Sequence, residues 1–196
     1  MGHDARELLD PEVAAQLQAL PYSYPEIGAT RQPRLPDGYR TEQFSVLAGR
    51  GRRRYDEVAE LVLNWRLQSR SGLRVQTDRP RVEPRAVAMA TLSLGPLRIR
   101  TRCRVLYLLA EENRCGYAYG TLLGHPERGE EQFLVEIDQR ENVRLRLRSF
   151  SRSDSLLARL GGPISRRVQL QVNRRYLEVV AEPGAVIEHR TGRAAA

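Results

Sequence analysis

The 196-residue sequence contains no lysine, although it carries 32 basic residues and a formal net charge of +8. All of the positive charge is therefore on arginine, whose planar guanidinium binds phosphate better than an ammonium group does. A basic chain of this kind raises the question of a polyanionic partner. The complete loss of one residue type, however, is more typical of a coding bias across a genome than of selection at one site.

Long apolar runs and cysteines are also scarce. No stretch approaches the roughly 20 apolar residues that span a bilayer, and the N-terminus, MGHDARELLDPEV, is too polar for a secretory signal. We therefore expect a cytoplasmic protein. The two cysteines, Cys103 and Cys115, lie on either side of a predicted turn and could face each other. Thiols in such a compartment are more often reduced, so their pairing stays open.

Recognised catalytic and metal-binding motifs are missing as well. The sequence has no nucleophile elbow, zinc knuckle, HExxH or kinase signature. Gly49-Arg50-Gly51 lacks the rest of a phosphate-binding loop and is interpreted as a turn between a strand and a helix. We predict no cofactor and no metal site. Nucleic-acid binding is not expected, because the exposed aromatic motifs of such proteins are not found.

The length and composition that are present fit one domain. Residues 1–40 are expected to form an N-terminal helix and a proline-rich arm packed on the domain. Residues 41–182 are expected to form the domain itself, and residues 183–196 a flexible tail. The N-terminal helix should run from Pro11 to Leu20 with Asp10 as its cap. The arm offers four apolar side chains for burial: Tyr22, Tyr24, Ile27 and Leu35.

Two periodicities divide the domain. A strand is predicted at 43–47, and apolar residues three and four apart predict a helix over about 52–68. A period of two then predicts an antiparallel meander of four long strands, the last one split by a turn: 85–94, 97–109, 115–123 and 131–150. A final helix from Pro163 to Val180 carries one apolar stripe: Leu157, Leu160, Ile164, Val168, Val172, Tyr176 and Val179.

The hairpin within 131–150 has a predictable register. Its apolar residues must share one face, because a slip of one residue would bury every charge. The pairing that best matches opposite charges sets Asp138 against Arg144 and Glu136 against Arg146. It leaves a loop at 140–142, in which Asn142 would take the left-handed conformation. The arginines of this hairpin then need no ligand.

A second series of arginines, Arg98, Arg100, Arg102 and Arg104, alternates with apolar residues and has no obvious acidic neighbour. A solvated outer face is the simpler interpretation, and a phosphate-binding surface is the alternative. A loop that contains His125, Glu130 and Glu131 resembles an acid–base or metal cluster, but turns collect polar residues and the spacing matches no metal motif. Tyr117, Tyr119 and Thr121 alternate, and would place their hydroxyl groups on one face.

The sequence resembles the Domain of Unknown Function 1990 family over about residues 20–180. The resemblance rests on these segments: Tyr24-Pro25-Glu26-Ile27-Gly28-Ala29-Thr30, Pro36-Asp37-Gly38-Tyr39, Cys103-Arg104-Val105, Tyr117-Ala118-Tyr119-Gly120-Thr121-Leu122, Gly124-His125-Pro126-Glu127 and Gly129-Glu130-Glu131-Gln132-Phe133. Leu123 and Ser153 stand where the family pattern often has proline. The family is similar to the helix-grip proteins, the START and Bet v 1-like group. This implies an α+β fold in which a curved antiparallel sheet wraps a long C-terminal helix around an apolar cavity.

Three hypotheses about function follow. The first is binding of a small, largely apolar ligand between the sheet and the C-terminal helix, by Tyr117, Tyr119, Thr121, His125, Val168 and Val172. The second is a cyclase-like or hydratase-like enzyme that uses His125 with Glu130 or Glu131 as acid and base. The third is an adaptor that binds nucleic acid or an anionic membrane through the Arg98–Arg104 face. Oligomeric state stays open.

Overall fold

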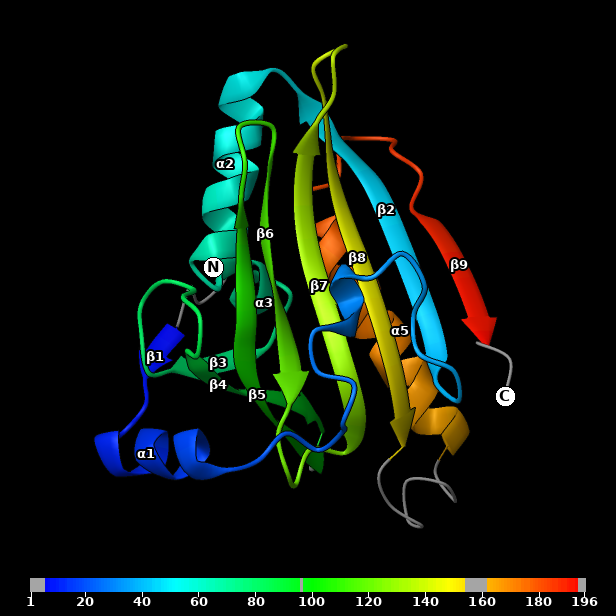
Figure 1. Ribbon diagram of the computed structural model, residues 1–196. Coiled ribbons are helices and arrows are strands. Elements are labelled where there is room, and N and C mark those ends of the chain that lie inside the picture. Colours follow the sequence, from blue (N-terminus) through cyan, green and yellow to red (C-terminus); the bar gives the residue numbers. More distant parts are fainter. Residues whose placement is uncertain (1–5, 96, 154–161, 194–196) are drawn as a thin grey trace.

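The computed structural model describes residues 6–95, 97–153 and 162–193, which form a nine-stranded sheet and the helices that pack on it (Figure 1). The strands are β1 (Arg6–Leu8), β2 (Arg40–Arg50), β3 (Arg74–Thr77), β4 (Val87–Leu94), β5 (Leu97–Ala110), β6 (Arg114–Thr121), β7 (Glu127–Ile137), β8 (Asn142–Ser153) and β9 (Glu188–Arg193). The helices are α1 (Pro11–Ala19), the 3-10 helix η1 (Ala29–Arg31), α2 (Arg52–Leu63), α3 (Arg66–Arg70) and α5 (Gly162–Glu178).

The sheet has the strand order β1-β3-β4-β5-β6-β7-β8-β2-β9 and does not close into a barrel. Its pairs are antiparallel except β1 with β3. Figure 1 shows a curved sheet with α2, α3 and α5 on one side, which we call the concave face. The segment between α1 and β2 crosses the other side, the convex face. The α+β helix-grip architecture expected from the sequence is confirmed.

Alternation along the strands separates the two faces. In β8, Val143, Leu145 and Leu147 are buried in the main core, whereas Arg146 between them is exposed. α5 contributes Tyr176 and other apolar side chains to the same core. The shared apolar face predicted for the β7–β8 hairpin is therefore confirmed. Leu157 and Leu160 of the predicted helical stripe lie outside the described residues, as does the side chain of Ile164.

The predicted hairpin register is wrong by two residues. In the structure Glu136 pairs with Arg144 and Leu134 with Arg146. Asp138 does not pair with Arg144, because its carboxylate accepts hydrogen bonds from the Arg140 and Asn142 backbone N–H groups at 2.8 and 2.9 Å. Asp138 thus closes the loop itself, and Glu141 rather than Asn142 takes the left-handed conformation. Local hydrogen bonding of the aspartate outweighs one exposed cross-strand ion pair.

The predicted helix over 52–68 is interrupted. α2 ends at Leu63, and Trp65 adopts a left-handed conformation with φ of 61° before α3 begins. This conformation is unfavourable for a large side chain. It is compensated by burial, since the indole is 2% exposed. The break turns Trp65 into the core, and periodicity alone could not reveal it.

The C-terminal segment is not the flexible tail that the sequence suggested, because residues 188–193 form β9 along β2. His189 stacks on Phe44 at a centroid distance of 4.0 Å, and its Nε2 lies 2.6 Å from buried Glu42. Thr191 also donates to Glu42, at 2.7 Å. Partners 147 residues apart hold this strand, so local composition carried no sign of it. The short strands β1 and β3 were likewise not predicted.

The N-terminal helix follows the expectation, since Asp10 accepts a 2.8 Å hydrogen bond from the backbone of Glu12 at the start of α1. In the arm, Tyr24 and Leu35 are buried, but Ile27 is 53% exposed, so its predicted burial is wrong. The two thiols are free and buried. Cys103 lies opposite Thr121, and Cys115 lies opposite Ala110, so the two cysteines do not face each other.

Candidate functional site

A cavity of about 410 Å³ lies between the concave face of the sheet and α5. β3, β4 and β5 line one side, α5 lines another, and the loop before β7 lies at the rim. The walls are mostly apolar, with contributions from Val75, Ala88, Ala90, Leu92, Ile99 and Val172. Small-molecule sites typically measure about 300–1,000 Å³ and combine apolar walls with a few polar groups. This cavity has both properties.

Glu131 of β7 is the main polar group of the cavity. Tyr119 of β6, directly opposite it in the sheet, donates a 2.5 Å hydrogen bond to its carboxylate. Burial raises the pKa of the Glu131 carboxyl to about 7, while hydrogen bonds from Tyr119 and Asn173 oppose this rise. Glu131 therefore changes its charge near neutral pH.

Four titratable groups that interact with Glu131 are neutral at that pH. They come from three elements, namely Tyr117 and Tyr119 of β6, Cys103 of β5 and Tyr176 of α5. Burial raises the pKa of each of them well above its ordinary value. Among the described residues that line the cavity there is no arginine. The carboxylate of Glu131 thus stands in an apolar setting without a cationic partner there.

Three further polar side chains line the cavity and are each at least 96% buried. The Trp65 Nε1, Gln68 Oε1 and Asn173 Nδ2 atoms have no hydrogen-bond partner among the described residues. Asn173 is close enough to Glu131 to favour its ionised form, but no hydrogen bond of normal geometry forms. Buried polar atoms are nearly always paired, so such atoms beside a cavity indicate a place for a polar partner.

His125 and Glu127 lie at the rim of the cavity. The Glu127 backbone N–H lies 2.9 Å from the His125 Nδ1 atom, as a donor to it. The Glu127 carboxylate is buried and lies 3.5 Å from the Arg40 guanidinium. Arg40 therefore offsets the charge of Glu127, whereas Glu131 has no cationic partner among the described residues that line the cavity.

Of the six ligand-binding residues proposed from the sequence, four line this cavity: Tyr119, His125, Val168 and Val172. Tyr117 does not line it. Its ring stacks on Phe133 at 5.2 Å, and its hydroxyl group accepts a 2.7 Å hydrogen bond from Gln68. Thr121 does not line it either, because its hydroxyl group contacts Ser23 of the arm at 2.6 Å. These two side chains serve packing instead.

Glu130, the alternative acid or base, faces away from the cavity. Its carboxylate lies on the convex face and accepts hydrogen bonds from Tyr24 Oη at 2.9 Å, from the Gly28 N–H, and from Thr30 N and Oγ1 at 3.0 and 2.8 Å. It is 3% exposed. Glu130 thus anchors the arm, and the pairing of His125 with Glu130 as acid and base is wrong. Strand alternation sends adjacent side chains to opposite faces.

The sequence reasoning missed Trp65, Gln68 and Asn173 as cavity residues. One signal was available for Asn173, which directly follows Val172 in the apolar stripe of the final helix and is a polar residue next to a buried face. A continuous helix over residues 52–68 does not predict that Trp65 and Gln68 line the cavity. Their position depends on the break between α2 and α3.

The cavity and fold can be set beside known proteins. The family model described as "Domain of unknown function (DUF1990)" matches residues 23–179, which is most of the chain. The chain belongs to the DUF1990 family. The resemblance found in the sequence is therefore confirmed.

Two relatives of this DUF1990 chain are UPF0548 proteins. The one from Deinococcus radiodurans is 29% identical over 193 residues, covering 88% of this chain and 96% of the relative. The one from Arabidopsis thaliana is 28% identical over 152 residues, covering 74% and 73%. Among solved structures, Ara h 8.0201 has a TM-score of 0.47 and a sequence identity of 8%, and the match covers 73% of this chain and 98% of that protein. Ginseng major latex-like protein 151 has a TM-score of 0.44 and a sequence identity of 11%, and the match covers 74% of this chain and 100% of that protein. Because both TM-scores are below 0.5, the description of the fold rests on the strands and helices of this chain and not on these two structures.

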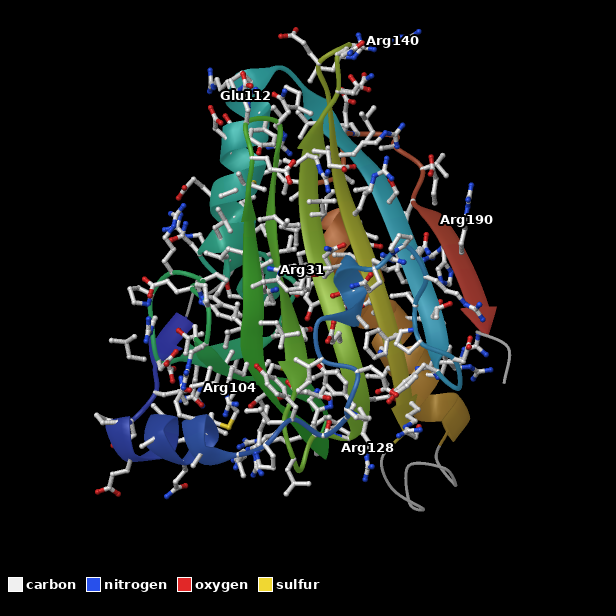
Figure 2. All side chains as sticks on the ribbon, viewed as in Figure 1. Arg31, Arg104, Glu112, Arg128, Arg140 and Arg190 are labelled. Atoms are coloured by element: carbon white, nitrogen blue, oxygen red, sulfur yellow. The ribbon has the colours of Figure 1, made fainter. Side chains whose placement is uncertain are left out.

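The convex face of the DUF1990 sheet carries a different feature, an open groove of about 920 Å³. Six arginines line it: Arg31, Arg114, Arg144, Arg146, Arg148 and Arg190. Figure 2 shows Arg31 and Arg190 on this side, from η1 and β9. Several of these arginines are engaged, for example Arg146 with Glu136 at 2.7 Å. Arg148 donates to three carbonyl groups of the arm. Much of this charge therefore holds the arm and the hairpin in place.

The Arg98–Arg104 series is not uniform. Arg98 and Arg100 are exposed, as expected for a solvated face. Arg104 instead donates to the backbone oxygens of Leu17, Gln18 and Leu20 at 2.6–2.8 Å, at the C-terminal end of α1 (Figure 2). This position is favourable for a cation because helix carbonyl groups are unpaired there. Arg104, one of the four arginines of the proposed polyanion-binding surface, is thus hydrogen-bonded to the backbone at the end of α1.

No helix among the described residues is long and apolar enough to cross a membrane. No group of three or more histidine, cysteine, aspartate or glutamate side chains in the described ranges could hold a metal ion.

Proposed function

We propose that this DUF1990 protein binds a small, largely apolar molecule in the cavity between the concave face of the sheet and α5. The observation that carries the proposal is the cavity itself, with about 410 Å³ of space and predominantly apolar walls. Exposing such walls to water without an occupant costs roughly 25 cal/mol for each Å². An apolar molecule that fills the space recovers this free energy.

The polar groups of the cavity add orientation. Glu131 and Tyr119 form one hydrogen-bonded pair, and Asn173 faces them from α5. Apolar contact supplies affinity without direction, whereas a few fixed polar groups decide how a ligand lies. Tyr119, His125, Val168 and Val172 from the sequence hypothesis line the cavity, which supports a role for them in ligand binding.

Native mass spectrometry of freshly purified protein tests the proposal directly. We expect an added mass that disappears when the protein is unfolded. Ala90→Phe, which fills the cavity from β4, should reduce the occupied fraction and the binding of Nile red, a neutral apolar dye. Ser93→Phe places the same side chain at an exposed position of the same strand and should leave both unchanged. A wild-type protein that carries no added mass and binds no dye would contradict the proposal.

One observation favours a second candidate, an enzyme that moves a proton within the cavity. A carboxyl group with a pKa of about 7 can both accept and give a proton near neutral pH. His125 lines the same cavity. In this candidate Glu131 is the acid or base, with His125 as its partner. Any turnover found for a cavity ligand should be lost in Glu131→Gln while binding of Nile red persists, and turnover that survives the substitution would exclude this role.

A further inference from the structure

The cavity and the rest of the chain have opposite charge. The whole sequence has a net charge of +8 and 32 arginines, but the described residues that line the cavity include no arginine and two glutamates, Glu127 and Glu131. Arg40 offsets the first of these at 3.5 Å. The second has only neutral groups around it, the hydroxyl of Tyr119 and the amide of Asn173. The cavity therefore contains a carboxyl group that a positively charged ligand group could pair with.

Resting on the proposed function, we infer that the cavity selects apolar molecules that end in a protonated amine, and that it discriminates against carboxylates. An ammonium group beside Glu131 would supply the cation that the fold does not provide. Charge-assisted hydrogen bonds are about twice as strong as neutral ones. In an apolar setting the attraction between opposite charges is also much larger than in water.

A carboxylate in the same place would meet Glu131 with a like charge. One of the two groups would have to remain protonated, because two ionised carboxylates cannot share a desolvated site cheaply. The N–H groups of Trp65 and Asn173 are free to donate hydrogen bonds to a hydroxyl or carbonyl oxygen of the ligand. They are uncharged, so they do not offset the repulsion between carboxylates. A neutral alcohol should therefore bind with intermediate affinity.

Binding of a protonated amine should release the proton that Glu131 holds. Burial raises the pKa of Glu131 to about 7, so its carboxyl group can hold a proton in the free protein near neutral pH. Binding of an ammonium ion favours the ionised carboxylate and thus releases this proton to solvent. Tyr117, Tyr119, Cys103 and Tyr176 do not compete for this proton, because burial keeps them neutral. His125 at the rim is the remaining titratable side chain of the lining that can carry a positive charge.

The test compares three probes with one chain length: octylamine, octanol and octanoate. Calorimetry or displacement of Nile red at pH 8 would give their affinities for the ligand-depleted protein. We expect octylamine to bind about tenfold or more tightly than octanoate, with octanol between them. In Glu131→Gln the preference for octylamine over octanol should disappear while octanol binding stays within about threefold. Glu136→Gln removes a carboxylate from the other face of β7 and should leave the preference intact.

The possible results separate this inference from the proposed function. If octanoate binds as tightly as octylamine, or if octylamine has no advantage over octanol in the wild-type protein, the inference is wrong and ligand binding stands. If the preference survives in Glu131→Gln, the amine is selected elsewhere and the inference is also wrong. If none of the three probes nor Nile red binds, the proposed function fails and the inference fails with it.

Discussion

On the concave face of the sheet, an apolar cavity holds one uncompensated carboxyl group; on the convex face, an open groove is lined by six arginines. Strands β5, β6 and β7 contribute side chains to both. Glu130 and Glu131 are neighbours in β7, yet the first accepts four hydrogen bonds from the arm and the second faces the cavity beside Tyr119. Two identical side chains therefore acquire unlike roles from the alternation of a strand.

The two carboxyl groups differ in how far the fold compensates their charge. Glu130 accepts hydrogen bonds from Tyr24, Gly28 and Thr30, so its partners are already in place. Glu131 is desolvated without such compensation, and its pKa is raised. A polar group that the fold leaves unsatisfied is a better candidate for a binding role than one that the fold satisfies fully.

The largest effect should come from Glu130→Gln. The new amide N–H₂ group would face the donors of Tyr24, Gly28 and Thr30, so we expect the free energy of unfolding to fall by roughly 2–4 kcal/mol. Denaturant unfolding measures this loss, and hydrogen exchange should place it in the arm. Glu131→Gln at pH 8 should be unchanged or more stable. An equal loss in the two variants would break the distinction between the faces.

The next effect is the pH dependence that Glu131 contributes. Its pKa rises from 4.5 to about 7 on folding, so the folded state holds a proton that the unfolded chain releases between these values. The stability contributed by this site is thus complete below about pH 4.5 and is lost as the pH rises through 7, by at most roughly 3 kcal/mol.

The check is the difference in unfolding free energy between wild type and Glu131→Gln, measured at pH 5, 6, 7 and 8. The unfolding free energy of the wild type relative to the variant should fall from pH 5 to pH 7 and level off by pH 8. A difference that grows in favour of the wild type with rising pH would mean that a cation compensates Glu131 after all.

A smaller effect separates two arginines of β5. Arg104→Met removes the donor for three carbonyl groups at the end of α1 and should lower the unfolding free energy by about 1–2 kcal/mol. Arg100→Met, at an exposed position of the same strand, should change it by less than about 0.5 kcal/mol. Equal effects would show that Arg104 does not hold α1 in place.

The smallest effect is expected in the convex groove. Arg146→Gln removes the 2.7 Å ion pair with Glu136, whose partners are 55% and 26% exposed in their side chains. We expect a loss below about 1 kcal/mol that shrinks further in 1 M salt. A larger, salt-independent loss would show that the groove is as desolvated as the cavity, and that the contrast between the faces is false.

Much of the fold could be predicted from periodicity and turn chemistry. The meander from β4 to β8, the α1 cap at Asp10 and the long final helix follow from patterns that span only a few residues. The errors share one cause. β9, the break at Trp65 and the register at Asp138 each depend on contacts that outweigh a local preference. Such contacts join residues that no short sequence window contains together.

The candidate site was predictable in kind but not in detail. The alternation of apolar residues in the strands and the apolar stripe of the final helix indicated which face of the sheet meets that helix. Tyr119, His125, Val168 and Val172 line the cavity on this face. Tyr117 shares the alternation of Tyr119, but it is fully covered by Phe133 and Gln68. Which members of one face meet open space depends on the side chains opposite them, and those come from α3 and α5.

The family, the antiparallel meander and the separation of arginine from apolar residues all follow from the amino-acid sequence, since a strand period of two can be read along the chain. The different compensation of Glu130 and Glu131 depends on the three-dimensional packing. Desolvation and hydrogen-bond compensation depend on what packs against a carboxylate in three dimensions. Tyr24 and Thr30 donate hydrogen bonds to Glu130. Glu131 accepts a hydrogen bond from Tyr119 and lines the cavity together with Asn173.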